Sequence, residues 1–315
     1  MSITTTRRRL AAAVLLAAPL FLAACSDGGD ERTASQPSAA APCPTTPVDV
    51  VVSVDQWGDI VSELGGACAK VTTLLASSSV DPHDYEPSPA DAAKFEGARL
   101  VVVNGGHYDE WATKLAAGSA PDAPVVDAAK ISGGDEHGEA NPHIWYLPAA
   151  VKGVADAVTA RLTELAPDAK AYFADRRRAF ADALGEYDRL IASIKASASG
   201  KTYAATESVF DYMAAAVGLQ NETPQGYQNA TSNESDPSPA DLDAFLGLLR
   251  TKGVDVLIYN TQTEGSVPAQ LRSAAEAAGV PVVEVTETVA PGADSFEAWQ
   301  VDQLKSLAKA LGVAG

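Results

Sequence analysis

The sequence predicts an α/β protein of two lobes, each a mainly parallel sheet with flanking helices, joined by a long rigid helix. Runs of β-branched residues alternate with helical stretches in residues 48–165, which is the pattern of a parallel sheet. A second alternation of this kind occupies residues 203–286. Between them, residues 168–198 contain no proline and carry apolar residues mostly three or four apart, as in an amphipathic helix. At about 1.5 Å per residue this helix spans about 45 Å, enough to run the length of two lobes.

The elements of each lobe follow from local composition. Valine-rich and leucine-rich runs predict strands, and periodic stretches between them predict helices. In the first lobe we expect strands at 48–54, 71–75 and 100–104, a further strand starting at 125–126, and helices at 56–64, 90–96 and 149–165. In the second lobe we expect strands at 203–206, 254–259 and 282–286, and helices at 209–217, 240–251 and 267–278.

One short motif occurs in both lobes. Residues 86–91 and 236–241 share the order acidic residue, Pro, Ser, Pro, Ala, Asp. In each copy a serine, Ser88 or Ser238, is placed to cap a helix, and a proline falls in the first turn. The repetition indicates similar geometry in the two lobes, or a capping solution that arose twice.

The first residues have the properties of an export signal. Three arginines at 7–9 precede an apolar run at 10–24, which is short for a membrane span of about 20 residues. The run ends in small residues before Cys25 and resembles a bacterial lipobox, whose cysteine is acylated after cleavage. The alternative is an ordinary signal with an unrelated cysteine. We therefore expect a lipoprotein signal at 1–24, a flexible tether at 25–46, an N-terminal lobe at 47–166, a backbone helix at 167–199 and a C-terminal lobe at 200–315.

Composition and charge restrict the class of partner. The 315 residues are 46% hydrophobic and 20% charged, which is a globular composition. The net charge of −18 becomes −21 without residues 1–24, which contain three arginines and no acidic residue. This balance argues against binding to nucleic acid or to anionic lipid surfaces, both of which attract Lys and Arg. It fits a cationic partner, although solubility alone also explains it.

Two cysteines remain once Cys25 is assigned to lipidation. Cys43 lies at the end of the tether and Cys68 lies in the first lobe. An exported protein meets an oxidising compartment, which favours a disulfide between them. The spacing alone leaves two free thiols as the alternative.

Four polar residues lie where strands or their loops end. His83 and His143 each follow a proline in a loop of the first lobe, Glu207 directly follows the strand at 203–206, and Glu287 follows the strand at 282–286. Ligands of open α/β sheets bind at the carboxyl ends of strands, and neutral imidazole is the commonest protein metal ligand. Two ligands from each lobe would hold a cation in the cleft between the lobes.

Other residues compete for these roles. Glu264 also follows a strand, which makes it a rival of Glu287 as the fourth ligand. His107, in a Gly-Gly-His turn, and His137, in the acidic glycine-rich loop at 133–139, are the two remaining histidines. Taken singly, each has the properties of an ordinary solvated side chain.

These motifs together resemble the metal-binding lipoproteins of ABC importers for zinc and manganese, over essentially residues 46–313. The motifs are at 83–89, at 104–105 with 110–111, at 142–145 and at 236–239, and the first and third are specific when found together. The resemblance implies a two-lobed solute-binding protein with a rigid backbone helix. It also implies the metal ligands His83, His143, Glu207 and, where the family usually has Asp, Glu287.

The chain departs from the family pattern in two further places. Asn141 stands where an aspartate commonly precedes Pro-His. The support that a carboxylate would give to the imidazole is then weakened, or another residue supplies it. The long histidine-rich loop of many zinc importers is reduced to residues 133–139.

Two imidazoles and two carboxylates favour Mn²⁺ as the cargo, although Zn²⁺ should bind at least as tightly in vitro. We expect a monomer without catalytic activity, anchored through lipid on Cys25 to the outer face of the cytoplasmic membrane, which delivers the ion to an ABC importer permease. Three alternatives remain open. They are a binding protein for a chelate such as haem or a siderophore, a metal-dependent hydrolase with Glu264 or Asp84 as base, and a surface interaction protein with a structural metal.

Overall fold

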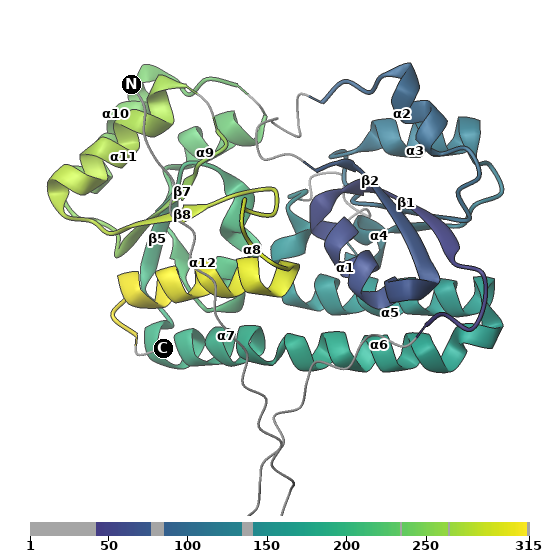
Figure 1. The fold of residues 1–315 in the computed structure, drawn as a ribbon. Coiled ribbons are helices and arrows are strands. Elements are labelled where there is room, and N and C mark those ends of the chain that lie inside the picture. The colour runs from purple at the N-terminus through teal and green to yellow at the C-terminus, as the bar shows by residue number, and fades with distance from the viewer. Residues whose placement is uncertain (1–41, 77–84, 134–140, 234, 264, 314–315) are drawn as a thin grey trace, which may run out of the picture. The chain divides into compact units, whose positions relative to one another are not determined.

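The computed structural model describes residues 42–76, 85–133, 141–233, 235–263 and 265–313. In these ranges the chain forms two four-stranded parallel sheets with flanking helices (Figure 1), as the sequence predicts. No helix in the described part of the chain is long and apolar enough to cross a membrane.

The first sheet has the strand order β2-β1-β3-β4, all parallel. Its strands are β1 (Val48–Val54), β2 (Ala69–Leu75), β3 (Leu100–Val103) and β4 (Val125–Asp127). The helices of this lobe are α1 (Asp55–Gly65), α2 (Pro89–Lys94), α3 (Glu110–Ser119), α4 (Ala128–Ser132) and α5 (Pro148–Leu165).

The second sheet repeats this arrangement with the order β6-β5-β7-β8, again all parallel. Its strands are β5 (Thr202–Ala205), β6 (Gln220–Asn221), β7 (Val256–Asn260) and β8 (Val282–Val285). The helices that follow are α8 (Asp211–Ala216), α9 (Gln225–Ser232), α10 (Pro239–Arg250), α11 (Ser266–Ala278) and α12 (Phe296–Ala310).

Both faces of each sheet are covered, which explains the unbroken valine runs. In β1, Val50 and Val52 face the large core, whereas Val51 packs on the other face with Val101 and Val103. Successive side chains of a strand point to opposite faces, so a strand covered on both sides is apolar throughout. The large core continues from the first lobe into the second, and a separate cluster fills the space under α10 and α11.

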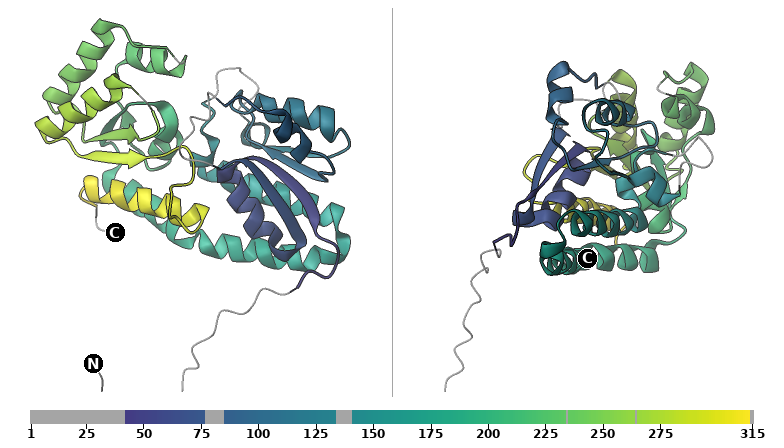
Figure 2. Two further views of the ribbon diagram at one scale, coloured as in Figure 1. Left: turned by 45° about the horizontal axis from the view of Figure 1, so that its top comes forward. Right: turned by 90° about the vertical axis from the view of Figure 1, so that its right-hand side faces the viewer.

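The segment joining the lobes consists of two helices in line, α6 (Lys170–Ala183) and α7 (Gly185–Ala198). Figure 1 and the left view of Figure 2 show them running along one side of the two lobes. The sequence predicts one helix here, and the structure interrupts it only at Leu184, next to the single glycine of this stretch. Backbone bonds continue across the interruption, from Leu184 to Phe180 and from Asp188 to Leu184.

The structure joins Cys43 and Cys68 in a disulfide, which ties the segment just before β1 to the end of the 3₁₀ turn that follows α1. Ser88 and Ser238 begin their helices as expected, each hydrogen-bonded to the aspartate three residues later. Five elements are missing from the sequence-based assignment: α3, α4, β6, α9 and α12.

Candidate metal centre

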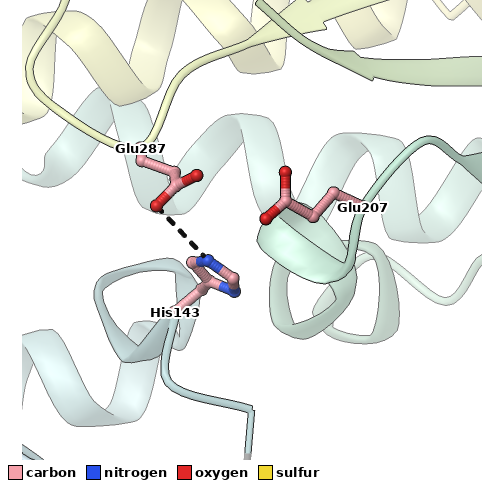
Figure 3. A group of neighbouring side chains, drawn as sticks. All are labelled: His143, Glu207 and Glu287. Carbon is pink, nitrogen blue, oxygen red and sulfur yellow. Dashed lines mark ion pairs between the residues drawn. The ribbon is translucent and has the colours of Figure 1, made fainter. Parts of the chain in front are cut away.

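Three predicted ligands come together at the carboxyl ends of the strands. His143, Glu207 and Glu287 each offer a ligand atom that lies within 4.8 Å of those of the other two (Figure 3). Ligand atoms about 2 Å from one ion lie up to about 4 Å apart, so small side-chain movements would close this group around a cation.

The three side chains come from both lobes. His143 lies just before the 3₁₀ turn Ile144–Tyr146 of the first lobe, while Glu207 follows β5 and Glu287 follows β8 in the second. His143 and Glu287 are buried, with 2% and 1% of their surfaces exposed, and Glu207 is partly buried. Fully buried charges are stable only when they are paired or bind a metal, and this burial is compatible with an ion pair between His143 and Glu287 as well as with a shared metal ion.

Asn141 fixes the orientation of His143. The Asn141 Oδ1 accepts the backbone N–H of His143 at 3.0 Å and contacts Nδ1 of its ring at 2.7 Å, while Nδ2 of Asn141 donates to the carbonyl of Ser208 at 2.7 Å. Because Oδ1 is an acceptor, Nδ1 carries the proton, and Nε2 is the ring atom with a lone pair that could bind a metal. Nε2 lies 3.6 Å from Oε2 of Glu287. The amide thus takes over the orienting role of the family's aspartate.

Asn104 is hydrogen-bonded to the loop that carries His143. Its Nδ2 donates to the carbonyl of Pro142 at 2.9 Å, and its Oδ1 accepts the indole N–H of Trp57 at 3.0 Å. Gly105 follows at a φ of +74°, and a Cβ there would lie 2.2 Å from Oδ1 of Asp127. Only glycine fits this turn, which gives a physical reason for the Asn-Gly motif.

The backbone of Glu287 is held by two glutamines. The amide of Gln56, from α1 of the first lobe, donates to the Glu287 carbonyl at 2.5 Å, and the Gln262 Oε1 accepts the Glu287 backbone N–H at 2.7 Å. The Tyr108 hydroxyl of the first lobe donates to Oε2 of Glu287 at 3.2 Å. Contacts from both lobes therefore position this carboxylate.

Electrostatics at the site favour positive charge. Burial alone would lower the pKa of His143, but hydrogen bonding and attraction to Glu287 and the charge of Glu207 raise it above its ordinary value. Burial, reinforced by the charge of Glu287, raises the pKa of Tyr108 well above its ordinary value. Tyr108 therefore remains a protonated donor to the carboxylate at neutral pH.

The structure does not describe every sequence-based candidate. His83, His137, Asp84 and Glu264 fall outside the described residues, so the fourth ligand stays a prediction. His107 is exposed, has a φ of +67° and pairs with Glu110 at 2.7 Å. It is not part of the three-residue group.

Sequence reasoning missed two side chains that contact the carboxylates. Asn260 at the end of β7 donates to both Glu207 and Glu287, and the hydroxyl of Thr263 donates to Glu207. Asn260 is the last residue of a strand, and Glu207 lies two residues after one. Its position at a strand end therefore could have identified Asn260 from the sequence, as it did Glu207.

A second acidic group lies between α1 and α12. Asp59, Glu63 and Glu297 also offer carboxylate oxygens within 4.8 Å of one another, but none is a nitrogen or sulfur ligand. Asp59 accepts the backbone N–H of Phe296, the first residue of α12. This contact gives Asp59 a structural role, because it satisfies one of the backbone N–H groups at the start of α12.

Comparison with known proteins places the chain among metal-binding proteins. A family model described as ZnuA, zinc-uptake complex component A periplasmic, matches residues 50–310. The high-affinity zinc uptake system protein ZnuA of Bacillus subtilis is 26% identical over 217 residues, which make up 64% of this chain and 67% of that protein.

A second relative and a solved structure extend the comparison. The zinc-binding lipoprotein AdcA of Streptococcus pneumoniae is 23% identical over 274 residues, or 79% of this chain and 53% of AdcA, so the chain spans about half the length of that relative. The structure of FpvC from Pseudomonas aeruginosa in complex with Mn²⁺ matches with a TM-score of 0.68 at 20% identity, covering 85% of this chain and 99% of FpvC. This last match concerns the fold.

Proposed function

Because the chain belongs to the zinc-uptake complex component A family, we propose that it is an extracytoplasmic solute-binding lipoprotein that captures a divalent transition metal ion, Zn²⁺ or Mn²⁺, and delivers it to an ABC importer. The observation that carries the proposal is the convergence of His143, Glu207 and Glu287 within 4.8 Å. Imidazole nitrogen and carboxylate oxygen are ligands that both ions accept. The names of the relatives, zinc uptake and zinc binding, and the Mn²⁺ complex of FpvC support the same class of cargo.

The ion would bridge the lobes. His143, and His83 as the fourth ligand, belong to the first lobe, whereas both carboxylates belong to the second. Binding would therefore draw the ligand side chains of the two lobes towards one another, and the loaded form would differ from the empty form at this surface in a way that a permease can recognise. Lipid on Cys25, a monomeric state and a position outside the cytoplasmic membrane complete the proposal.

The proposed role is binding without catalysis. Four protein ligands would leave no open position for an activated water, which a catalytic zinc site requires. Three ligand atoms so close together suit a bare ion better than a chelate such as haem, whose ring would separate them.

Titration of the purified protein with Zn²⁺ and Mn²⁺, in competition with a chelator of known affinity, tests the proposal. We expect one ion per chain, and a loss of at least about tenfold in affinity for each of His83→Ala, His143→Ala, Glu207→Ala and Glu287→Ala. Glu264→Ala serves as the control and should bind like the wild type.

If all four variants kept the wild-type stoichiometry and affinity, the site assignment would be wrong. If Glu264→Ala lost binding while Glu287→Ala kept it, Glu264 would replace Glu287 among the four ligands. Absence of binding to the wild-type protein would overturn the proposed function itself.

A further inference from the structure

The amide of Asn260 lies between the two acidic side chains of the site. Its Nδ2 donates to Oε2 of Glu207 at 2.8 Å and to Oε1 of Glu287 at 2.9 Å. Asn260 is 1% exposed and ends β7, the strand that lies between β5 and β8 in the sheet. The middle strand thus connects the ligands that follow its two neighbours.

The orientation of this amide is fixed. Oδ1 of Asn260 accepts the backbone N–H of Gln262 at 3.0 Å, and the Asn260 backbone N–H donates to the hydroxyl of Thr206 at 3.1 Å. Because Oδ1 must be the acceptor, Nδ2 must face the carboxylates, and both of its hydrogens are used. Rotating the amide would put an oxygen against two carboxylates, which is strongly unfavourable.

The hydrogen bonds from Asn260 to the two carboxylates restrict how each carboxylate can bind an ion. Oε2 of Glu207 accepts hydrogen bonds from both Asn260 and the hydroxyl of Thr263, which occupy its two lone pairs. The other oxygen, Oε1, accepts no hydrogen bond from the described residues. In Glu287, Asn260 holds Oε1, while Oε2 faces Nε2 of His143 and accepts a hydrogen bond from the Tyr108 hydroxyl, which leaves room for an ion on its second lone pair. In each carboxylate Asn260 therefore holds one oxygen, and we expect the other oxygen to bind the ion.

We propose that Asn260 is a specificity-determining residue that keeps Glu207 and Glu287 as one-oxygen ligands and so favours four-coordinate Zn²⁺ over Mn²⁺. Zn²⁺ is commonly tetrahedral, whereas Mn²⁺ prefers six ligands that are mostly oxygen. The inference rests on the proposed function, because it concerns the same metal site. The composition of the ligand set favours manganese, but the hydrogen bonds within the site favour zinc.

Two substitutions of Asn260 distinguish the effect of its hydrogen-bond donor from the effect of its side-chain volume. Asn260→Leu has a similar size and no donor, and Asn260→Ala removes both; Asn229→Ala, at an exposed asparagine, is the matched control. We expect Zn²⁺ affinity to fall about 10- to 100-fold in both Asn260 variants and Mn²⁺ affinity to change by less than about threefold, since freed carboxylates can bind Mn²⁺ through both oxygens. The zinc-to-manganese affinity ratio then falls at least about tenfold.

Co²⁺ absorption gives a readout that a purely structural role would not change. Four-coordinate Co²⁺ absorbs visible light much more strongly than six-coordinate Co²⁺. We expect an intense four-coordinate spectrum for the wild type and the Asn229→Ala control. The Asn260 variants should give a weaker spectrum of higher coordination number.

Other outcomes overturn the inference in distinguishable ways. Equal loss of affinity for both ions with an unchanged Co²⁺ spectrum would leave Asn260 a purely structural residue. A wild type that binds neither ion would overturn the metal site and this inference with it. If the Asn260 variants fail to fold, Thr263→Val tests the inference instead, because this substitution removes the other hydrogen-bond donor to Oε2 of Glu207. The zinc-to-manganese affinity ratio of Thr263→Val should be lower than that of the wild type, and an unchanged ratio would reject the inference.

Discussion

Asn141 gives the clearest case of one residue substituting for another at this site. The family pattern has an aspartate there, and its carboxylate would accept from the imidazole N–H. The structure places the amide oxygen of Asn141 in that role and uses the amide nitrogen to reach the carbonyl of Ser208, directly after Glu207. One side chain therefore orients His143 and links the two lobes.

Substitutions at Asn141 should separate these two roles. Asn141→Ala removes the acceptor for Nδ1 of His143, and we expect metal affinity to fall about tenfold or more. Asn141→Asp keeps the acceptor, so affinity should stay within about threefold of the wild type. This variant places a carboxylate oxygen against the Ser208 carbonyl, however, and should lose about 1 kcal/mol of unfolding free energy. Chelator competition and urea unfolding measure the two effects, and wild-type affinity in Asn141→Ala would contradict the orienting role.

The residues of the site differ in how far sequence alone could identify them. Glu207 and Glu287 follow strands, and the edge of a parallel sheet brings such positions together. His143 was predicted on its proline-containing loop, but the hydrogen bonds of Asn104 and Asn141 that aim it depend on tertiary contacts. Asn260 was missed because its role appears only when β5, β7 and β8 are placed side by side.

Among the elements, strands with valine-rich runs were predicted to within two residues of their observed ends. β6 was missed because its two residues, Gln220 and Asn221, are polar and pair only with β5. α12 was missed although Ser295 caps it and its buried side chains recur at helical spacing. That pattern was available in the sequence, whereas the packing of α12 on α7 and β8 was not.

The contact between α1 and α12 places several acidic side chains together. Burial, and then the charges of Glu297 and Asp59, raise the pKa of Glu63 to about 8, although Arg176 opposes this. Burial raises the pKa of Asp59 as well. A carboxyl group with a raised pKa binds its proton more tightly in the folded state than in the unfolded state.

The stability of the protein should therefore fall as pH rises through this range. For Glu63 the contribution is fully present below about pH 4.5 and is lost as pH approaches 8. Glu63→Gln cannot ionise, so at pH 8 its metal-free form should be more stable than the wild type by about 1–2 kcal/mol once solvent screening is allowed for. At pH 5 the gain should be much smaller. Urea unfolding at both pH values measures the difference.

Glu222→Gln, at an exposed glutamate, is the matched control and should leave stability unchanged at both pH values. Suppose that the free energy of unfolding decreases from pH 5 to pH 8 by the same amount in Glu63→Gln as in the wild type. This result would show that Glu63 does not titrate in this range.

At the scale of the whole molecule, the two lobes share one large core instead of forming two independent ones. Buried side chains of both sheets, of α5 to α7 and of α12 belong to a single cluster. A shared core and a backbone of two helices in line restrict how far the lobes can separate. Metal capture is then expected to involve small movements around His143, Glu207 and Glu287 instead of wide opening.

The two-lobed architecture follows from the alternation of strands and helices, and the family match agrees with it. The proposed metal site combines residues that lie 64 to 144 positions apart in the chain, so its geometry depends on the fold as a whole. The net charge of −18 agrees with a cationic cargo but does not specify it. Specificity is expected to reside in the few side chains at the strand ends.

Anomalous diffraction at the zinc absorption edge, from crystals of the zinc-loaded protein, tests the central claim most directly. We predict one strong peak about 2.0–2.2 Å from Nε2 of His143 and from one oxygen each of Glu207 and Glu287, with His83 as the fourth ligand. A main peak among Asp59, Glu63 and Glu297, or one bonded to neither Glu207 nor Glu287, would contradict it.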